Sequence, residues 1–327
     1  MASHYKPAYR IELNGKDVTD LWSEVLESLT VTDEAGIKTD TCEVAFDNRE
    51  GFSAPPIGAT LKVWLGYDPT PTYMGSYKVA TWTKDGPLRR LTLSARAADL
   101  TSKIRSPKMK SWHEKTVKDI VSEIAGDNGL SAIVDGTIGA IFIEHIDQQT
   151  ESDVNFLTRL ARRVGATFKL ADGKVLFAAK GSARVPDGNE KSAKIIVPEQ
   201  VSTWSATMES RGDFGTVATQ YRDPASAKRK WARAGTGGDV YHDRHLYGSQ
   251  AEAEAAGKAK LGDLTRGQIS ATIDGPGNTS LFAEALVKLK GFDADVDGTF
   301  LAKSVSHTFS ARGFTTSATL ETEGASK

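Results

Sequence analysis

The chain has 327 residues, of which 39% are hydrophobic and 25% are charged, and its formal net charge at pH 7 is -1. This composition is ordinary for a soluble protein of two or three domains, and the balanced charge gives no general attraction to nucleic acid or to an anionic membrane. The one cysteine, Cys42, excludes an internal disulfide, and no apolar run approaches the roughly 20 residues that span a bilayer. Met1–Arg10 lacks the apolar core of a signal peptide, so we expect folding in a reducing cytoplasm without membrane insertion.

Residues 1–100 have the pattern of an all-β domain. Tyr9–Leu13 alternates apolar and polar residues and ends at the turn pair Asn14-Gly15, and a short helix or turn is expected at Leu21–Leu26. Five more strand candidates follow, separated by glycine, proline, aspartate and asparagine: Leu29–Thr32, Thr41–Asp47, Thr60–Tyr67, Ser76–Thr83 and Arg89–Ala95. Six short strands with hairpin-sized links predict a small antiparallel barrel or sandwich.

Residues 101–181 have a mixed pattern that predicts an α/β domain. Lys103–Lys110 contains four cations without any period, so we expect an exposed connector there. Thr116 and Asp119 form a capping-box pattern at the start of a helix near 116–125. The apolar face of this helix consists of Val117, Ile120, Val121 and Ile124, and a short strand is expected at Ile141–Ile146.

The segment Gln148–Gly165 predicts a second helix, near 151–164, that runs directly into a hairpin. Thr150 followed by Asp153 resembles a capping box, and Gly165 can supply a left-handed C-cap. The apolar stripe of the helix comprises Val154, Phe156, Leu157, Leu160, Ala161 and Val164, with Arg159, Arg162 and Arg163 towards its end. The hairpin consists of Thr167–Ala171 and Lys174–Ala178 around the turn Asp172-Gly173.

Residues 182–327 return to strands. The candidates are Val201–Ser210, Thr216–Tyr221, Gln268–Ile273, Leu286–Leu289, Phe300–Phe309 and Phe314–Glu321. Ser249 with Glu252 predicts the start of an alanine-rich helix that extends to Leu264. Asp223–Gly248 is basic and contains glycines, so we expect a loop of poor local order, and a loop-helix insertion near 223–265.

An internal repeat relates Gly58–Leu93 to Glu284–Leu320. Two short motifs recur in the same order: Trp64-Leu65-Gly66-Tyr67-Asp68 as Leu289-Lys290-Gly291-Phe292-Asp293, then Met74-Gly75-Ser76-Tyr77 as Asp297-Gly298-Thr299-Phe300. The expected class is therefore α+β, mostly β. Two similar small antiparallel β-barrel, tube-like domains (1–100 and 182–327) would have the α/β domain (101–181) between them.

One stretch resembles a known family. Gln148, Glu151, Ser152 and Asp153, followed by Phe156-Leu157, Arg159-Leu160 and Gly165, resemble the hub proteins of contractile tails. These are the late control D proteins of P2-like phages, the T4-type baseplate hub and the N-terminal part of the type VI secretion spike protein. Both predicted barrels also resemble the P2-type proteins, through Leu61–Gly66 with Met74–Tyr77, and through Gly298–Val305 with His307, Gly313 and Phe314.

The resemblance implies a structural protein and not an enzyme. It implies a homotrimeric ring that joins the sixfold tail tube to the threefold central spike, in the baseplate of a phage virion or an R-type bacteriocin assembled in the bacterial cytoplasm. The implied partners are further copies of the chain, the spike, the tail tube protein, and the tape-measure and other baseplate proteins. Because the chain stops at Lys327, soon after its last predicted strand, we expect the spike to be a separate polypeptide.

Three groups of residues are compatible with other chemistry. Glu151 and Asp153 could be the paired carboxylates of a tail-associated cell-wall hydrolase, although a helix N-terminus explains both electrostatically. His242 and His245 lack a third metal ligand nearby. The basic run Lys228–Arg233 includes Trp231 and could contact nucleic acid, but no binding fold surrounds it, so a solvated or partner-facing loop is expected. The sequence therefore predicts no catalytic residue, cofactor site, metal site or specific nucleic-acid contact.

Overall fold

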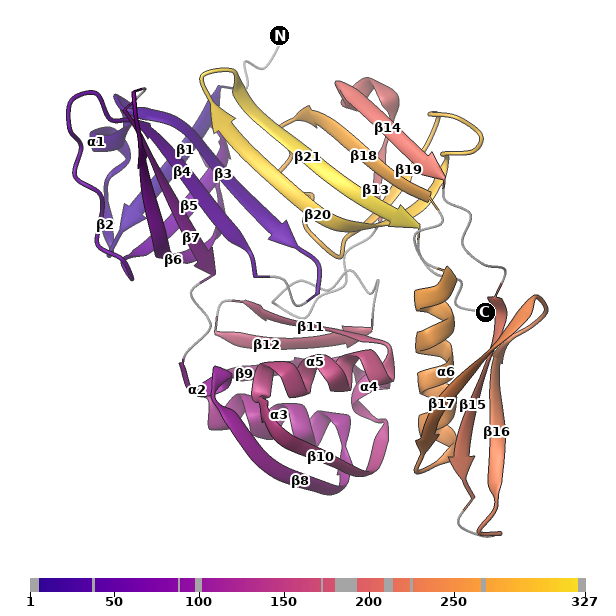
Figure 1. Cartoon of the computed structure of the whole chain (residues 1–327). Helices are drawn as coiled ribbons and strands as arrows, with labels where there is room; N and C mark the ends of the chain where they lie inside the picture. The colour runs from indigo at the N-terminus through magenta and orange to yellow at the C-terminus, as the bar shows by residue number, and fades with distance from the viewer. Residues whose placement is uncertain are drawn as a thin grey trace.

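The computed structural model describes residues 6–36, 39–87, 89–97, 102–171, 173–179, 193–208, 214–223, 226–265 and 269–322. Strands dominate it. Figure 1 shows a broad layer of strands from the N-terminal and C-terminal parts of the chain, with an α/β unit and a smaller helix-on-sheet unit both below that layer in this view.

The first β-unit begins with a hairpin at the predicted turn, where Asn14 and Gly15 have φ values of 48° and 80°. Its elements are β1 (Pro7–Leu13), β2 (Lys16–Asp17), α1 (Thr19–Ser23), β3 (Leu26–Glu34), β4 (Thr41–Asp47), β5 (Thr60–Tyr67), β6 (Thr72–Asp85) and β7 (Arg90–Ala97). Each predicted strand is present. Their inward residues form one core, in which Trp22 packs edge-on against Phe46 with ring centroids 4.9 Å apart.

The second β-unit is formed by the C-terminal part of the chain. Its elements are β13 (Lys194–Ile196), the 3-10 helix η1 (Pro198–Gln200), β14 (Thr203–Met208), β18 (Ile269–Pro276), β19 (Leu286–Leu289), β20 (Gly298–Ser310) and β21 (Gly313–Thr322). It has its own core, centred on Val287, Phe300, Val305 and Leu320. The strand candidates predicted for this part are present, with ends shifted by a few residues.

The two β-units share one 13-stranded sheet. Its hydrogen-bonded path is β14-β18-β21-β20-β3-β4-β7-β6-β5-β1-β2, and β19 pairs with both β20 and β13. The mostly-β class is therefore confirmed. Within the described ranges this path does not return to its start, so the two β-units lie in a continuous sheet in which no single closed barrel forms.

The two β-units also share their pairing scheme. In the first, β5, β6 and β7 form an antiparallel meander, and in the second, β19, β20 and β21 do the same. Each long central strand has a bulge three residues after a buried aromatic, at Ala80 after Tyr77 and at Lys303 after Phe300. Leu61 lies opposite Tyr77, and Val287 lies opposite Phe300, so the strand pairing aligns Leu61 with Val287. Counted from that pair, Gly66 lies one residue beyond the position of Gly291, and the predicted match of these two glycines stays a prediction.

The α/β unit has two longer helices, α3 and α5, two helices of four residues, α2 and α4, and two small sheets. Its elements are α2 (Ser102–Arg105), β8 (Pro107–Thr116), α3 (Val117–Asp127), β9 (Ser131–Val134), α4 (Gly136–Gly139), β10 (Phe142–Ser152), α5 (Asp153–Val164), β11 (Ala166–Ala171) and β12 (Lys174–Ala179). The Thr116–Asp119 capping box and the β11–β12 hairpin are confirmed. Trp112 stacks on Phe156 in the core, with centroids 6.0 Å apart.

Two predictions in this unit are wrong. Lys103–Lys110 is not a connector, because it forms α2 and the start of β8, which pairs antiparallel with β10. Thr150 does not begin α5. It lies at a bulge of β10 with φ of 50°, and Ser152 is the N-cap that accepts a hydrogen bond from the Asn155 N–H. Gly165 is the left-handed C-cap, as predicted.

The third unit replaces the predicted loop at Asp223–Gly248, and that prediction is wrong. The segment supplies β16 (Arg229–Gly235) and β17 (Asp239–Tyr247), which pair on either side of β15 (Phe214–Arg222) beneath α6 (Gln250–Thr265). The exposed Arg233 of β16 lies between the buried Ala232, which packs with Ala253 and Ala256 of α6, and the buried Ala234, which packs with Leu261 of α6. Small buried residues gave this strand a weak apolar signal, and the glycines mark its turn.

Candidate assembly interface

Strands β3 and β20 join the two β-units edge to edge. Residues 28–34 of β3 pair antiparallel with residues 304–310 of β20. Two hydroxyl pairs cross this junction: Thr30 with Thr308 at 3.1 Å, and Thr32 with Ser306 at 2.8 Å, between their side-chain oxygens. The chain therefore contains, within itself, one contact between the edges of its two similar units.

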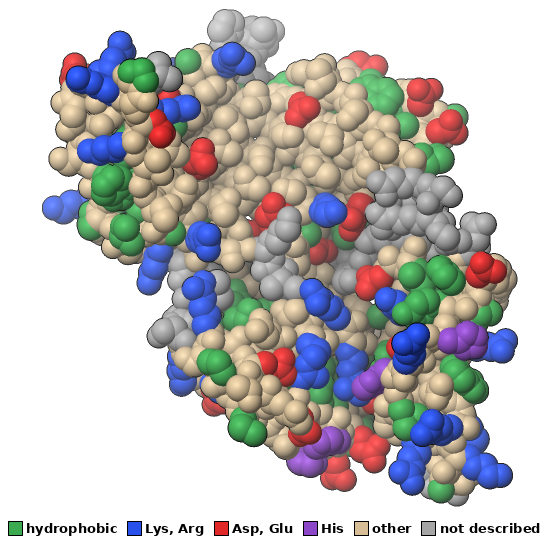
Figure 2. Space-filling model, viewed as in Figure 1, with side chains coloured by type: hydrophobic (Ala, Val, Ile, Leu, Met, Phe, Trp, Pro, Cys, Tyr) green, Lys and Arg blue, Asp and Glu red, His purple; other side chains and the backbone are tan. Residues whose placement is uncertain are grey.

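One face of the shared sheet is rich in hydroxyl groups. Most residues of this face that lie opposite each other across successive strands are Ser or Thr: Thr30, Thr32, Ser94, Ser306, Thr308, Ser317, Thr319, Thr272, Thr203 and Ser205. Two carboxylates interrupt the rows, Glu43 between Thr30 and Ser94, and Asp274 between Thr203 and Ser317. The alternate residues, such as Leu29 and Leu320, are buried in the two cores. Figure 2 shows this face over β3, β20 and β21 as a broad area with few charged or apolar side chains. Such a face is wetted by water but offers few charges to an anionic or cationic partner.

Lys169 forms ion pairs that connect the α/β unit to the β3–β20 junction. It projects from β11, and its Nζ pairs with the carboxylates of Asp33 on β3 and, at 3.1 Å, Asp40. Asp33 also accepts a 2.8 Å hydrogen bond from the N–H of Ala283, next to the second β-unit. Burial, and then the neighbouring Asp33, raise the pKa of Asp40 to about 7. Asp33 thus lies where both β-units and the α/β unit meet.

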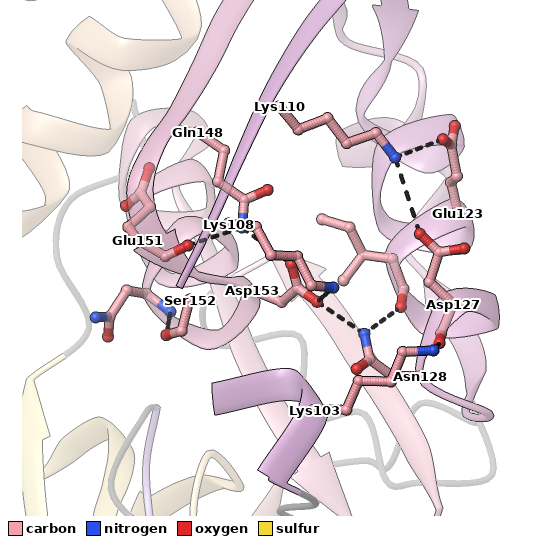
Figure 3. A network of polar contacts seen from close by, with 12 residues as sticks. Lys103, Lys108, Lys110, Glu123, Asp127, Asn128, Gln148, Glu151, Ser152 and Asp153 are labelled. Carbon is pink, nitrogen blue, oxygen red and sulfur yellow. Dashed lines mark hydrogen bonds and ion pairs between the residues drawn. The ribbon is translucent and has the colours of Figure 1, made fainter. Parts of the chain in front are cut away.

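Asp153, in the stretch that resembles the hub family, is the centre of a buried polar network (Figure 3). Its carboxylate accepts hydrogen bonds from Gln148 at 2.9 Å, Asn128 at 2.8 Å and Lys108 at 2.5 Å. Burial alone would raise the pKa of Asp153, but these three donors outweigh burial and hold the pKa below its ordinary value. The carboxylate therefore stays ionised and connects β8, α3 and β10 at the first turn of α5.

Glu151 has a different partner. It forms an ion pair with Arg159, which lies eight residues further along the chain on α5, and Arg159 also donates to the carbonyl oxygen of Asp147 at 2.6 Å. Glu151 and Asp153 thus hold the start of the helix in place, each with its own cation. The lowered pKa of Asp153 does not suit it for the general acid of a glycosidase, which is a carboxyl group held protonated.

A buried ion pair connects the α/β unit with the third unit. Arg163 of α5 pairs with Glu252 of α6, whose side chain is 2% exposed, and it also lies over the ring of Tyr247, 5.5 Å from the centroid. Gly165 is in close contact here, since a Cβ added to it would lie 3.1 Å from the Cβ of Ala259. Both the positive φ and the close approach of α6 therefore favour glycine at this position.

His242, His245 and most of the basic run Lys228–Arg233 lie on strands of the third unit. His242 and His245 lie on β17, edge-on against Trp231 and Tyr247 at 5.3 and 4.7 Å. A second pair, missed from the sequence, comes together across β8 and β10: His113 and His145, whose Nδ1 atoms are 3.1 Å apart. The basic run lies on β16, where a charged edge strand resists unwanted strand pairing.

Neither a metal centre nor a membrane span is found in the described parts of the chain. No cluster of three or more His, Cys, Asp or Glu side chains there has the arrangement to hold a metal ion. Over the same residues, no helix combines the length and apolar character needed to cross a bilayer. The features that remain are the β3–β20 junction, its hydroxyl-rich face and the contact of Lys169 with Asp33 and Asp40.

Comparisons with known proteins agree on one family. Residues 59–313 match the model of the phage tail baseplate hub (GPD) family. The chain is 31% identical to a probable baseplate hub protein of Escherichia phage 186, over 96% of this chain and 92% of the relative. It is 29% identical to a protein of the same description from Escherichia phage P2, over 96% and 93%.

Solved structures share the fold at much lower identity. A tail protein from Neisseria meningitidis MC58 has a TM-score of 0.71 at 14% identity, covering 98% of both chains. The 43 kDa tail protein of prophage MuSo2 from Shewanella oneidensis has a TM-score of 0.68 at 14% identity, covering 96% of this chain and 98% of the other. An Escherichia coli component of the type VI secretion system has a TM-score of 0.58 at 12% identity, covering 92% and 74%.

Proposed function

Because this chain belongs to the phage tail baseplate hub family, and is thus a hub protein of a phage-type tail, we propose that it acts as a trimeric symmetry adaptor. Three copies would form a ring that meets the sixfold tail tube on one side and the threefold central spike on the other. The named relatives are structural hub proteins and not enzymes, and no enzymatic role is assigned.

The observation that supports the proposal is the duplication of the β-unit. Each chain holds two units with the same strand pairing and the same bulge position, joined edge to edge through β3 and β20. Three chains supply six such units, which matches the symmetry of a tail tube. The same three chains retain threefold symmetry elsewhere, where a trimeric spike can bind.

The remaining units support this arrangement because they break the duplication. The α/β unit and the unit of α6 with β15–β17 each occur once in the part of the chain that the structure describes, and both lie on one side of the β-layer (Figure 1). They would therefore contribute threefold contacts. We divide the chain into 1–100, 101–181 and 182–327, with an insertion in the last part that comprises the predicted 223–265 together with β15 (Phe214–Arg222).

The partners follow from this position. A baseplate hub belongs to the virion tail, and the proposed contacts are further copies of the chain, a separate spike protein, the tail tube protein, and the tape-measure and other baseplate proteins. The same arrangement would serve in a phage-derived bacteriocin, with assembly in the bacterial cytoplasm.

The test is the mass of the complex formed when the chain is co-expressed with the spike protein encoded beside it. Native mass spectrometry should give three copies of this chain with three of the spike. A two-to-two or six-to-three complex would overturn the adaptor role. Zymography of the same complex on peptidoglycan should leave the gel intact, and clearing would revive the hydrolase alternative.

A further inference from the structure

The duplication identifies an unpaired sheet edge as the counterpart of a paired one. The strand order β5-β6-β7-β4-β3 in the first unit is equivalent to β19-β20-β21-β18-β14 in the second. In this equivalence β14 corresponds to β3, and β6 corresponds to β20. β3 pairs with β20 inside the chain. Their equivalents, β14 and β6, do not pair with each other there, so each of them lacks the partner strand that its counterpart has.

Both of these edges are free and exposed. Among the described residues, β14 pairs only with β18, and residues 81–85 of β6 pair only with β7. Every residue in both segments is exposed. Their large apolar side chains stand in solvent, with Trp82 43% exposed and Met208 66% exposed. Free edges with apolar side chains favour pairing with another chain.

The sequences of the corresponding strands agree with this assignment. Residues 28–32 read Ser-Leu-Thr-Val-Thr, and residues 203–207 read Thr-Trp-Ser-Ala-Thr, with the same alternation of hydroxyl and apolar side chains. The pairings of each strand with its neighbours align Leu29 with Trp204. The bulges of β6 and β20 align Thr81 with Ser304.

From this geometry we propose that β14 of one copy pairs antiparallel with the end of β6 in the next copy, in one fixed register. Ser306 lies opposite Thr32 inside the chain, so Thr83 lies opposite Thr207 of the neighbouring copy. The same register sets Trp82 opposite Met208 and Asp85 opposite Ser205. This inference rests on the proposed ring and names its seam.

The side chains fit this register. Thr83 with Thr207 repeats the hydroxyl pair that Ser306 and Thr32 make at 2.8 Å. Trp82 and Met208 cover each other's apolar surface, and sulfur–aromatic contacts are favourable. The contact joins two different edges, so it propagates from copy to copy and ends only when a ring closes.

Disulfide trapping tests the register. The variant Thr83→Cys/Thr207→Cys, assembled with the spike and oxidised, should run on a non-reducing gel as linked dimers and trimers that reductant separates. The native Cys42 is buried, and burial raises the pKa of its thiol to about 12, so its background reactivity is low. The pair Thr32→Cys/Ser306→Cys is the positive control, because it should close within one chain.

A second pair of cysteines tests whether β14 and β6 pair in a shifted register. Thr83→Cys/Thr203→Cys places the second thiol four residues along the same face and should remain unlinked. Links from this pair, or none from Thr83→Cys/Thr207→Cys in a complex of three-to-three mass, would overturn the register while leaving the adaptor role intact. A different mass with the predicted links would keep the seam and remove the trimer. Complete absence of self-association would remove both.

A charge variant gives an independent readout. Met208→Lys should weaken self-assembly at least tenfold, because it would bury a second ammonium in the seam beside Lys84, whose Nζ already lies 5.8 Å from the centre of the Trp82 ring. Met109→Lys is the control, since Met109 is 81% exposed on β8, away from both edges. Equal assembly of the two variants would contradict the proposed seam.

Discussion

The Nζ of Lys169 lies 3.1 Å from a carboxylate oxygen of Asp40 and also pairs with Asp33. One cation of the α/β unit therefore serves two acidic groups beside β3, at the junction of the two β-units. A single ammonium cannot fully offset two nearby carboxylates, and this imbalance makes the site sensitive to pH.

The first prediction concerns Asp40. Its pKa in the folded protein, about 7, is above the ordinary value of 3.8, so the folded state binds this proton more tightly than the unfolded state does. The stabilising contribution is full below about pH 4 and is lost as the pH rises through 7, by at most about 4 kcal/mol. Denaturant unfolding from pH 4 to 8 should show wild type losing stability relative to Asp40→Asn. The exposed variant Glu50→Gln should follow wild type, and parallel curves for wild type and Asp40→Asn would refute the assignment.

The second prediction concerns His307, whose contribution to stability changes with pH in the opposite direction. Its Nε2 donates to the carbonyl oxygen of Leu281 at 3.2 Å, and its Nδ1 accepts from the Thr316 hydroxyl at 2.9 Å. Burial lowers the pKa of His307, so the folded state favours the neutral ring, and stability is lost as the pH falls below about 6.5. His307→Gln keeps the donor to Leu281 but cannot titrate. Its thermal midpoint should fall less than that of wild type between pH 7 and 5. An equal fall would show that His307 is not the group responsible.

The third prediction separates the two carboxylates at the start of α5. Asp153→Ala leaves Lys108 and two amide donors without their buried acceptor and should cost about 3 to 5 kcal/mol of unfolding free energy. Glu151→Ala breaks an ion pair whose arginine is 44% exposed and should cost less than about 1 kcal/mol. Urea titration of both variants measures the difference. Similar losses would mean that the network in Figure 3 contributes little.

The fourth prediction tests the inner face of α5. Leu157 and Leu160 are fully buried, so Leu157→Asp or Leu160→Asp should unfold or aggregate the α/β unit, because an unpaired buried charge costs several kcal/mol. Arg162→Ala, on the exposed side of the same helix, should leave the thermal midpoint nearly unchanged. Circular dichroism melts are sufficient. If all three variants melt together, the helix face has been assigned wrongly.

The sequence predicted those elements whose signal lies within a few residues. β4 and β5 have the predicted bounds because alternation and turn residues mark both ends. β16 was missed because its inward residues are alanines, and Thr150 was mistaken for a cap because a bulge displaces it by two positions. Lys169 and Asp33 are 136 positions apart in the sequence, and no local sequence pattern predicts their contact. The site therefore depends on tertiary pairing that spacing alone does not encode.

The β3–β20 junction also affects how a ring of these chains would respond to dilution. In such a ring, every second contact between β-units would be the β3–β20 pairing within one chain, which forms when that chain folds. A contact within one molecule does not depend on the protein concentration. Lowering the protein concentration would therefore open only the alternate seams and release chains whose two β-units are still joined. In a closed ring the departure of one chain breaks two seams at once, so loss of the first copy would be the slow step, and the opened remainder would come apart faster.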